Sequence, residues 1–147
     1  MVTRSLLYGF ATLCALISSR QDWTANGASA CEKYLTPEVV STIMDGPAEQ
    51  PKQDAANSCH RGSLYVTLSV RTRDVEEFRR EIPRIADAHP LSGVGDAAYW
   101  NGGGATTAVK GRRECVISVL VPQFAKIHNA ELGQKFGEIC NTLLALP

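Results

Sequence analysis

The chain has 147 residues, of which 44% are hydrophobic and 20% charged, with fifteen basic and fifteen acidic side chains. This balance, without a long basic run, argues against nucleic acid and polybasic membrane surfaces as partners. Apart from residues 1–30, the length suits one domain with a modest core and is too short for two.

Residues 1–30 have the pattern of a secretory signal peptide. Arg4 supplies the positive start, residues 6–18 form an apolar run, and "ASA" at 28–30 resembles a cleavage site. The run is roughly a dozen residues long, shorter than the ~20 of a membrane-spanning helix. We therefore expect a signal peptide at 1–30, a single domain at 31–147, no transmembrane span, and a periplasmic or secreted location. A lipid anchor on Cys31 is less favoured, because Ala28 stands where a lipobox prefers Leu.

The first part of the expected domain is a helix, a loop and a strand. In "LTPEVVSTIMDG", Thr36 is suited to cap a short helix that starts at Pro37 and ends by Gly46. Residues 47–58, "PAEQPKQDAANS", have two prolines and few apolar side chains, which predicts an exposed loop. The segment "LYVTLSVRT" from Leu64 alternates apolar and polar residues, as a half-buried strand does.

A second helix is predicted in "DVEEFRREIPRIADA", residues 74–88. Asp74 and Glu77 have the spacing of a capping box, and Val75 and Phe78 begin an apolar stripe expected to pack on the preceding strand. Pro83 removes a backbone donor from the pattern, so we expect a kink or an early end there.

Residues 96–121 predict antiparallel sheet. The strands are expected at "DAAYW", "ATTAVK" and "RECVISVLV", joined by "NGGG" and by a tight turn at Gly111. The glycines at 102–104 thus connect strand to strand, whereas a phosphate cradle needs a helix N-terminus. "GVGD" at 93–96 lacks the third glycine of a dinucleotide fingerprint. No cofactor is expected.

The last element is a helix over "NAELGQKFGEICNTLLAL", with Asn129 as its cap. One face holds apolar residues and a cysteine: Leu132, Phe136, Ile139, Cys140, Leu143. Together the elements predict an α+β fold, in which three helices pack on an antiparallel sheet as a two-layer sandwich.

Four cysteines in an exported domain indicate two disulfides. Cys140 lies on the core face of the last helix, and Cys115 shares a face with the apolar residues of the strand before it, so a Cys115–Cys140 bond would join helix to sheet. Cys31–Cys59 is then the second bond. The nested pairing, Cys31–Cys140 with Cys59–Cys115, remains open. The sequence has no C-x-x-C pair, which argues against a zinc knuckle and against a redox site, and no metal site is expected.

The order of these segments resembles a known group. "CEKYLTPEVVSTIMDG", "CHRGSLYVTLSV", "LSGVGDAAYW" and "AVKGRRECVISVLV" together resemble small secreted or lipid-anchored bacterial domains of unknown function. That group is similar to the extracellular sensor domains of receptor-type bacterial Ser/Thr kinases. The resemblance implies an α+β sandwich and a binding role outside the cytoplasm, and it implies no reaction.

Side chains that could perform chemistry are dispersed. His60, His89 and His128 are too far apart in sequence for a local metal motif and are expected to be ordinary surface histidines. Asp96 and Glu114 could form an acid pair across the sheet, although Asp96 is better explained as a turn-fixing side chain that binds backbone N–H groups. No G-x-S-x-G elbow is present.

Aromatic and basic residues are better candidates for binding. Tyr99 and Trp100 must point to opposite faces of their strand. Beside the "NGGG" turn they could form a rim with the basic side chains Lys110, Arg112 and Arg113 that binds an acidic protein surface or an anionic envelope ligand. The plainer interpretation is that both rings cap the core.

The sequence therefore predicts an exported, non-catalytic binding protein that recognises a protein or envelope ligand, with an inhibitor, immunity or sensor-like role. The alternative is a small secreted hydrolase whose histidine and carboxylate meet only in the fold. A concave pocket that gathers both groups would favour the hydrolase.

Overall fold

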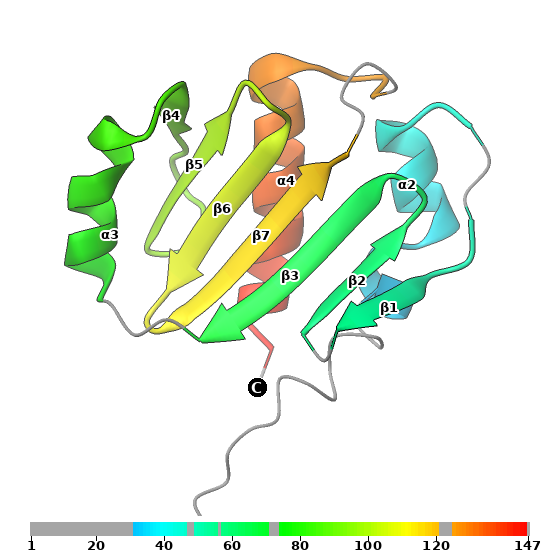
Figure 1. Ribbon diagram of the computed structural model, residues 1–147, viewed down its shortest axis with the longest axis horizontal. Helices are drawn as coiled ribbons and strands as arrows, with labels where there is room; N and C mark the ends of the chain where they lie inside the picture. The colour runs from blue at the N-terminus through cyan, green and yellow to red at the C-terminus, as the bar shows by residue number, and fades with distance from the viewer. Residues whose placement is uncertain (1–30, 47–48, 56, 71–73, 121–124, 147) are drawn as a thin grey trace, which may run out of the picture.

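The computed structural model describes residues 31–46, 49–55, 57–70, 74–120 and 125–146. They contain a seven-stranded antiparallel sheet with the strand order β1-β2-β3-β7-β6-β5-β4 (Figure 1). The predicted signal peptide at 1–30 lies outside the described residues. The mixed α+β class and the antiparallel sheet are confirmed.

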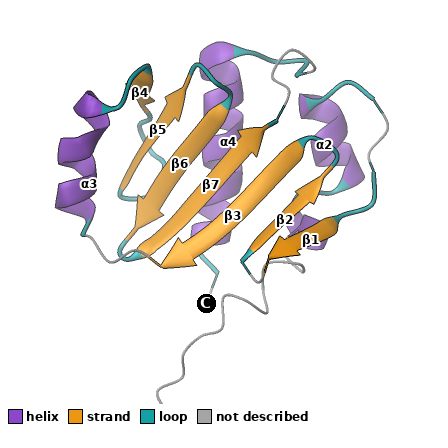
Figure 2. Cartoon of the chain, viewed as in Figure 1, coloured by secondary structure: helices purple, strands orange, loops and turns teal. Residues whose placement is uncertain are grey.

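Along the chain, α2 is followed by three strands, then by α3 and η1, then by four strands and finally by α4 (Figure 2). The strands are β1 (Lys52–Ala55), β2 (Ser58–Arg61), β3 (Leu64–Val70), β4 (Ala88–Pro90), β5 (Ala97–Asn101), β6 (Ala105–Lys110) and β7 (Arg113–Val119). Residues 31–34 are helical, and the described residues after them contain α2 (Pro37–Ile43), α3 (Val75–Glu81), the 3₁₀ helix η1 (Ile82–Arg84) and α4 (Asn129–Leu144). The three predicted helices correspond to α2, α3 and α4. The 3₁₀ helix η1, which contains Pro83, is a fourth, and the helical residues 31–34 were not predicted.

The main core lies between the sheet and the pair α2 and α4, which cover one face (Figure 1). Alternate residues of β3 and β7 point towards these helices because successive strand residues face opposite ways. Phe136 of α4 is fully buried against this face. The buried residues that β3 and β7 contribute are Leu64, Val66, Leu68, Cys115, Ile117 and Val119.

Helix α3 lies on the other face of the sheet, where its apolar cluster includes residues of β4, β5 and β6. Phe78 packs on Tyr99, with ring centroids 5.8 Å apart, and Ala97 and Val109 complete this smaller cluster. At this end the sheet therefore has helices on both faces, whereas the predicted sandwich had one helical layer and one sheet. The expected packing of α3 on the preceding strand is wrong: β5 and β6 present apolar side chains to the stripe, whereas β3 presents Tyr65 and polar residues there.

The exposed loop predicted at 47–58 is wrong in part, since residues 49–51 have no regular structure, while 47, 48 and 56 lie outside the described residues. Residues 52–55 form β1, and Ser58 begins β2. In the β2–β3 hairpin, Cys59 pairs with Val66, and β1 then pairs with β2 across a bulge between Gln53 and Ala55. Backbone pairing with β2, which itself pairs with the alternating strand β3, outweighs the poor strand propensity of this polar segment.

Two of the three helix N-caps expected from the sequence are confirmed. The Thr36 side chain accepts a hydrogen bond from the backbone of Val39 (3.3 Å), and Asp74 caps α3 in the same manner. The predicted cap on α4 is wrong: His128 occupies the N-cap position without a side-chain hydrogen bond, and Asn129 is the first helical residue, with a φ of 57°. No described helix is both long enough and apolar enough to cross a membrane.

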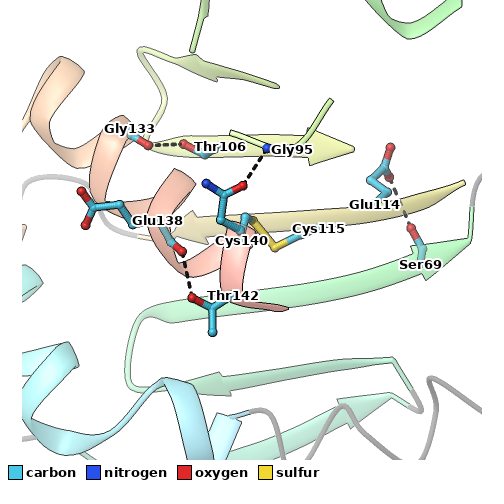
Figure 3. Close-up of a disulfide and its surroundings, with 10 residues drawn as sticks. Ser69, Gly95, Thr106, Glu114, Cys115, Gly133, Glu138, Cys140 and Thr142 are labelled. Carbon is cyan, nitrogen blue, oxygen red and sulfur yellow. Dashed lines mark hydrogen bonds between the residues drawn. A yellow bond between two sulfur atoms is a disulfide. The ribbon is translucent and has the colours of Figure 1, made fainter. Parts of the chain in front are cut away.

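Both expected disulfides are present. Cys31 bonds Cys59, with Cα atoms 6.2 Å apart, and Cys115 bonds Cys140, with Cα atoms 5.6 Å apart. The second bond joins β7 to α4 in the buried core (Figure 3). This sequential pairing excludes the nested alternative.

Candidate functional site

A small cavity lies between the β5–β6 hairpin and the first turns of α4. Its volume is about 60 Å³, and we call it the Trp100 cavity. The hairpin contributes Trp100, Asn101, Gly102, Gly104, Ala105 and Thr106; the α4 side contributes His128, Asn129, Leu132, Gly133 and Phe136. The walls thus combine two aromatic rings with a polar rim.

Trp100 is held in place from two sides of the sheet edge. Its indole lies so close to Gly133 that a Cβ added to this glycine would overlap the indole. The His89 ring from β4 stacks on the indole, with centroids 4.5 Å apart and 20° between the ring planes. The tryptophan is half-buried and its ring position is fixed by packing.

Hydrogen bonds shape the hairpin beside it. Buried Thr106 donates its hydroxyl to the Gly133 carbonyl (3.2 Å), which ties β6 to α4 (Figure 3). Asn101 accepts from Gly104 N with its backbone oxygen (3.1 Å) and from Ala105 N with its side-chain oxygen (3.2 Å). The glycines at 102–104 therefore form a turn between strands, as expected.

The five residues proposed as one binding rim do not come together. Tyr99 points to the opposite face from Trp100 and packs on α3. Lys110 pairs with Arg113 at the other end of β6, a strand whose six residues span roughly 17 Å. Arg112 lies in the β6–β7 turn there. The basic turn and the Trp100 cavity are thus separate surfaces.

Arg113 has a structural role. Its guanidinium donates to the backbone oxygen of Leu146, so it holds the chain beyond α4 against the end of β7. Lys110 and Arg112 are exposed beside it.

The "GVGD" segment joins three parts of the fold. Asp96 accepts a hydrogen bond from Gly111 N (2.7 Å), so its carboxylate fixes the β6–β7 turn, which confirms the turn-fixing interpretation. Asn141 of α4 accepts from Gly95 N (2.7 Å) and donates to the Gly93 carbonyl (2.8 Å). Gly95 has a φ of +54°, and a Cβ there would overlap the backbone of Val109. The motif is architectural.

The acid pair proposed across the sheet is not formed as a unit. Glu114 accepts a hydrogen bond from the Ser69 hydroxyl (3.3 Å, Figure 3), whereas Asp96 binds the turn. The two carboxylates thus serve different local contacts.

Two histidines form pairs with carboxylates. The Nδ1 atom of His60 lies 2.7 Å from Asp54, and its ring stacks on Tyr65. The Nε2 atom of His89 lies 3.1 Å from Asp87. The third histidine, His128, lines the Trp100 cavity, whose lining residues include no carboxylate.

These pairs do not supply the arrangement that would favour a hydrolase, in which a cavity gathers a histidine with a carboxylate. The described residues also contain no cluster of three or more histidine, cysteine or acidic side chains that could hold a metal ion.

A wider groove runs along the exposed flank of α4. Its volume is about 430 Å³, and it is lined by Thr42, Ile127, Glu131, Gln134, Lys135 and Glu138. The Lys135 and Glu138 side chains form an exposed ion pair (3.6 Å). This groove is open and mostly polar, and lacks the aromatic walls of the Trp100 cavity.

The sequence did not predict β4, which places His89 and Asp87 beside the cavity. This strand has three residues and ends in Pro90, so neither length nor alternation could indicate it. Comparisons with protein family models, with curated proteins and with solved structures find no match to the chain. The site is therefore interpreted from its own geometry.

Proposed function

We propose that this chain is an exported, non-catalytic binding protein that captures a protein partner by inserting one partner side chain into the Trp100 cavity. The observation that supports this most directly is the aromatic wall of the cavity. Contacts with Gly133 and His89 hold Trp100 in position in the absence of a partner. Preorganised aromatic residues at the centre of an interface commonly dominate binding energy, since little side-chain entropy is lost on binding.

The size of the cavity supports a protein partner over a small-molecule ligand. Pockets for drug-sized ligands are about 300–1,000 Å³. A cavity of about 60 Å³ has room for only the end of one side chain. Leu132 and Phe136 make its interior apolar, which favours an aliphatic group, while Asn101, His128 and Asn129 offer polar contacts at the rim.

The two disulfides of the domain are consistent with an exported binding protein. Two disulfides join its helices to its sheet, and such bonds persist in oxidising compartments. An inhibitor, immunity or sensor-like role would use the same rigid surface.

Filling the cavity tests this function. We expect Leu132→Phe to occupy the cavity with its larger ring and to abolish capture of a stoichiometric partner from an envelope extract by oxidised residues 31–147. The double variant Lys110→Ala/Arg112→Ala is the matched control, because it changes the turn at the other end of β6, and it should capture the partner as well as the wild type.

Trp100 also provides a direct measurement. It is the only tryptophan between residues 31 and 147, since the other is Trp23. Addition of the purified partner should therefore shift the Trp100 emission of the wild type and of the control, and leave that of Leu132→Phe unchanged. Equal capture by all three proteins, or capture without an emission change, would exclude the cavity as the binding site.

A further inference from the structure

The Asn101–Gly102 peptide at the end of β5 combines four chemical features in one place. Asparagine followed by glycine is the pair in which a backbone nitrogen most easily reaches the preceding side-chain amide, because glycine has no side chain to obstruct it. The pair lies at an exposed turn beside the Trp100 cavity.

The nucleophile is the backbone nitrogen of Gly102. Gly102 follows Asn101, the last residue of β5, and is exposed at the turn. The hydrogen bond that closes the turn to the Asn101 carbonyl is donated by Gly104 N and not by Gly102 N.

The electrophile is the side-chain amide of Asn101. Its oxygen already accepts a hydrogen bond from Ala105 N (3.2 Å). When the amide carbon is attacked, negative charge develops on this oxygen, and a fixed N–H donor stabilises such charge.

The base is the carboxylate of Asp87. Ala88 pairs with Asn101, which places Asp87 opposite Gly102, and a Cβ added to Gly102 would overlap Asp87 Oδ2. Asp87 has a φ of 56°, a conformation uncommon for residues other than glycine. His89 contacts the other carboxylate oxygen (3.1 Å) and so orients the group.

We propose that this arrangement is a self-modification site at which Asn101 deamidates, with Asp87 as the general base. The Gly102 nitrogen attacks Asn101 Cγ, and its proton passes to Asp87. The new N–Cγ bond closes a five-membered imide, the Cγ–Nδ2 bond breaks, and the proton leaves with the amide as ammonia. Water then opens the imide at either carbonyl and yields aspartate or isoaspartate. One water is consumed and one ammonia is released, with no oxidant or reductant.

The product alters the Trp100 cavity. Either product adds a negative charge at residue 101, which lines the cavity rim. Isoaspartate also lengthens the backbone by one carbon between Trp100 and the turn, which disturbs the hydrogen bonds that residue 101 makes to Gly104 N and Ala105 N. The inference is independent of the proposed binding function, since it concerns covalent chemistry of the chain alone.

The test is a rate measurement on the oxidised full chain in oxygen-18-labelled water at neutral pH. The tryptic peptide Ile85–Lys110 contains Asn101 as its only asparagine and contains no cysteine, so its mass reports this site alone. When the amide becomes an acid in this water, we expect the peptide mass to rise by about three daltons. About one comes from the change of amide to acid and about two from the labelled oxygen. The folded protein should react faster than the same protein unfolded in urea.

Two variants test whether Asp87 is the general base. Asp87→Gly accepts the positive φ at this position, adds no asparagine to the measured peptide, and should slow the folded-state reaction at least about tenfold, because a positioned base commonly contributes more than that. Asp54→Asn changes the other histidine–carboxylate pair and should leave the rate unchanged. The ratio of folded to unfolded rates is compared for each protein, so a general effect on folding is separated from loss of the base.

Two results would overturn the proposal. One is a folded wild type that deamidates no faster than its urea-unfolded form. The other is an Asp87→Gly protein with the same folded-to-unfolded ratio as the wild type.

Discussion

Trp100 crosses α4 at Gly133, where no side chain separates the indole from the helix backbone. The same glycine accepts a hydrogen bond from Thr106 through its carbonyl (3.2 Å). Strand β5 contributes the ring and strand β6 the hydroxyl, so both strands of the hairpin meet α4 at one residue. This contact sets the separation between helix and sheet at the Trp100 cavity.

Gly133→Ala should destabilise the protein. In an unobstructed helix the change would stabilise by about 1 kcal/mol, because alanine has the higher helix propensity. Here the methyl group would overlap the indole, and overpacking of this kind costs about 1–3 kcal/mol. Urea unfolding monitored by Trp100 emission measures the sign. Gln134→Ala, at the exposed neighbouring position, should be close to neutral; a stabilised Gly133→Ala protein would show that the indole moves aside freely.

Asp96→Ala should loosen the β6–β7 turn. The carboxylate accepts from Gly111 N (2.7 Å), and loss of such a charge-assisted bond costs about 1.5–3 kcal/mol. Hydrogen exchange of the Gly111 amide should accelerate in this variant. Asp45→Ala removes only an exposed ion pair with Lys126 (3.8 Å), and its cost should stay within about 1 kcal/mol. Equal losses in the two variants would contradict the role assigned to Asp96.

Removal of the buried disulfide should lower the free energy of unfolding strongly. Cys115 and Cys140 are 25 residues apart, for which the chain-entropy model gives about 3.5 kcal/mol. Cys115→Ala/Cys140→Ala also removes two fully buried sulfur atoms, so a larger loss is expected. Cys31→Ala/Cys59→Ala opens a similar separation of 28 residues and also removes two buried sulfur atoms. Urea denaturation should therefore show losses of similar size in the two variants, and a much smaller loss in either would contradict this account.

The start of α2 should show a pH dependence. The pKa of the Glu38 carboxyl is lowered from its usual value of 4.5, first by its own backbone N–H and then by the Thr36 hydroxyl. Because the folded pKa is the lower one, ionised Glu38 stabilises the fold above pH 4.5, and this contribution is lost as the pH falls through the folded pKa. Carboxyl titration by NMR should show the pKa of Glu38 rise towards 4.5 in Thr36→Val.

Thr36→Ser is the control for that titration, because it retains the hydroxyl and should keep the pKa of Glu38 low. If Thr36→Val leaves the titration of Glu38 unchanged, the hydroxyl does not contribute to the shift.

The sequence predicted elements where local pattern and tertiary packing agree. Leu64 to Val70 alternates over a full strand, and Asp74 and Thr36 carry their own capping chemistry. For the strand and the caps, neighbouring residues in the chain contained the needed information. The placement of Cys115 and Cys140 on facing apolar surfaces favoured the observed disulfides, but the nested pairing stayed open until the structure excluded it.

The remaining features depend on pairing and packing that their own residues do not indicate. β1 and β4 are short strands that form by pairing with β2 and β5, the strands that follow them in the chain. The proposed rim failed for a similar reason: Trp100 and Arg112 are close in sequence, but β6 lies between their two turns. The cavity required knowledge of where α4 crosses the hairpin, which no local pattern gives.

The pairing of β3 with β7 has a consequence for how the chain folds. Its register joins Leu64 to Val119 and Val70 to Arg113, residues more than forty positions apart, while every other strand pair in the sheet is between neighbours in sequence. Neither disulfide links the two halves of the chain that meet there. Cys31–Cys59 closes a loop that ends before β3, and Cys115–Cys140 closes a loop that starts in β7. Oxidation therefore closes two separate loops and does not shorten the search that brings them together. The β3–β7 junction is the expected rate-limiting encounter in refolding, even with both bonds intact.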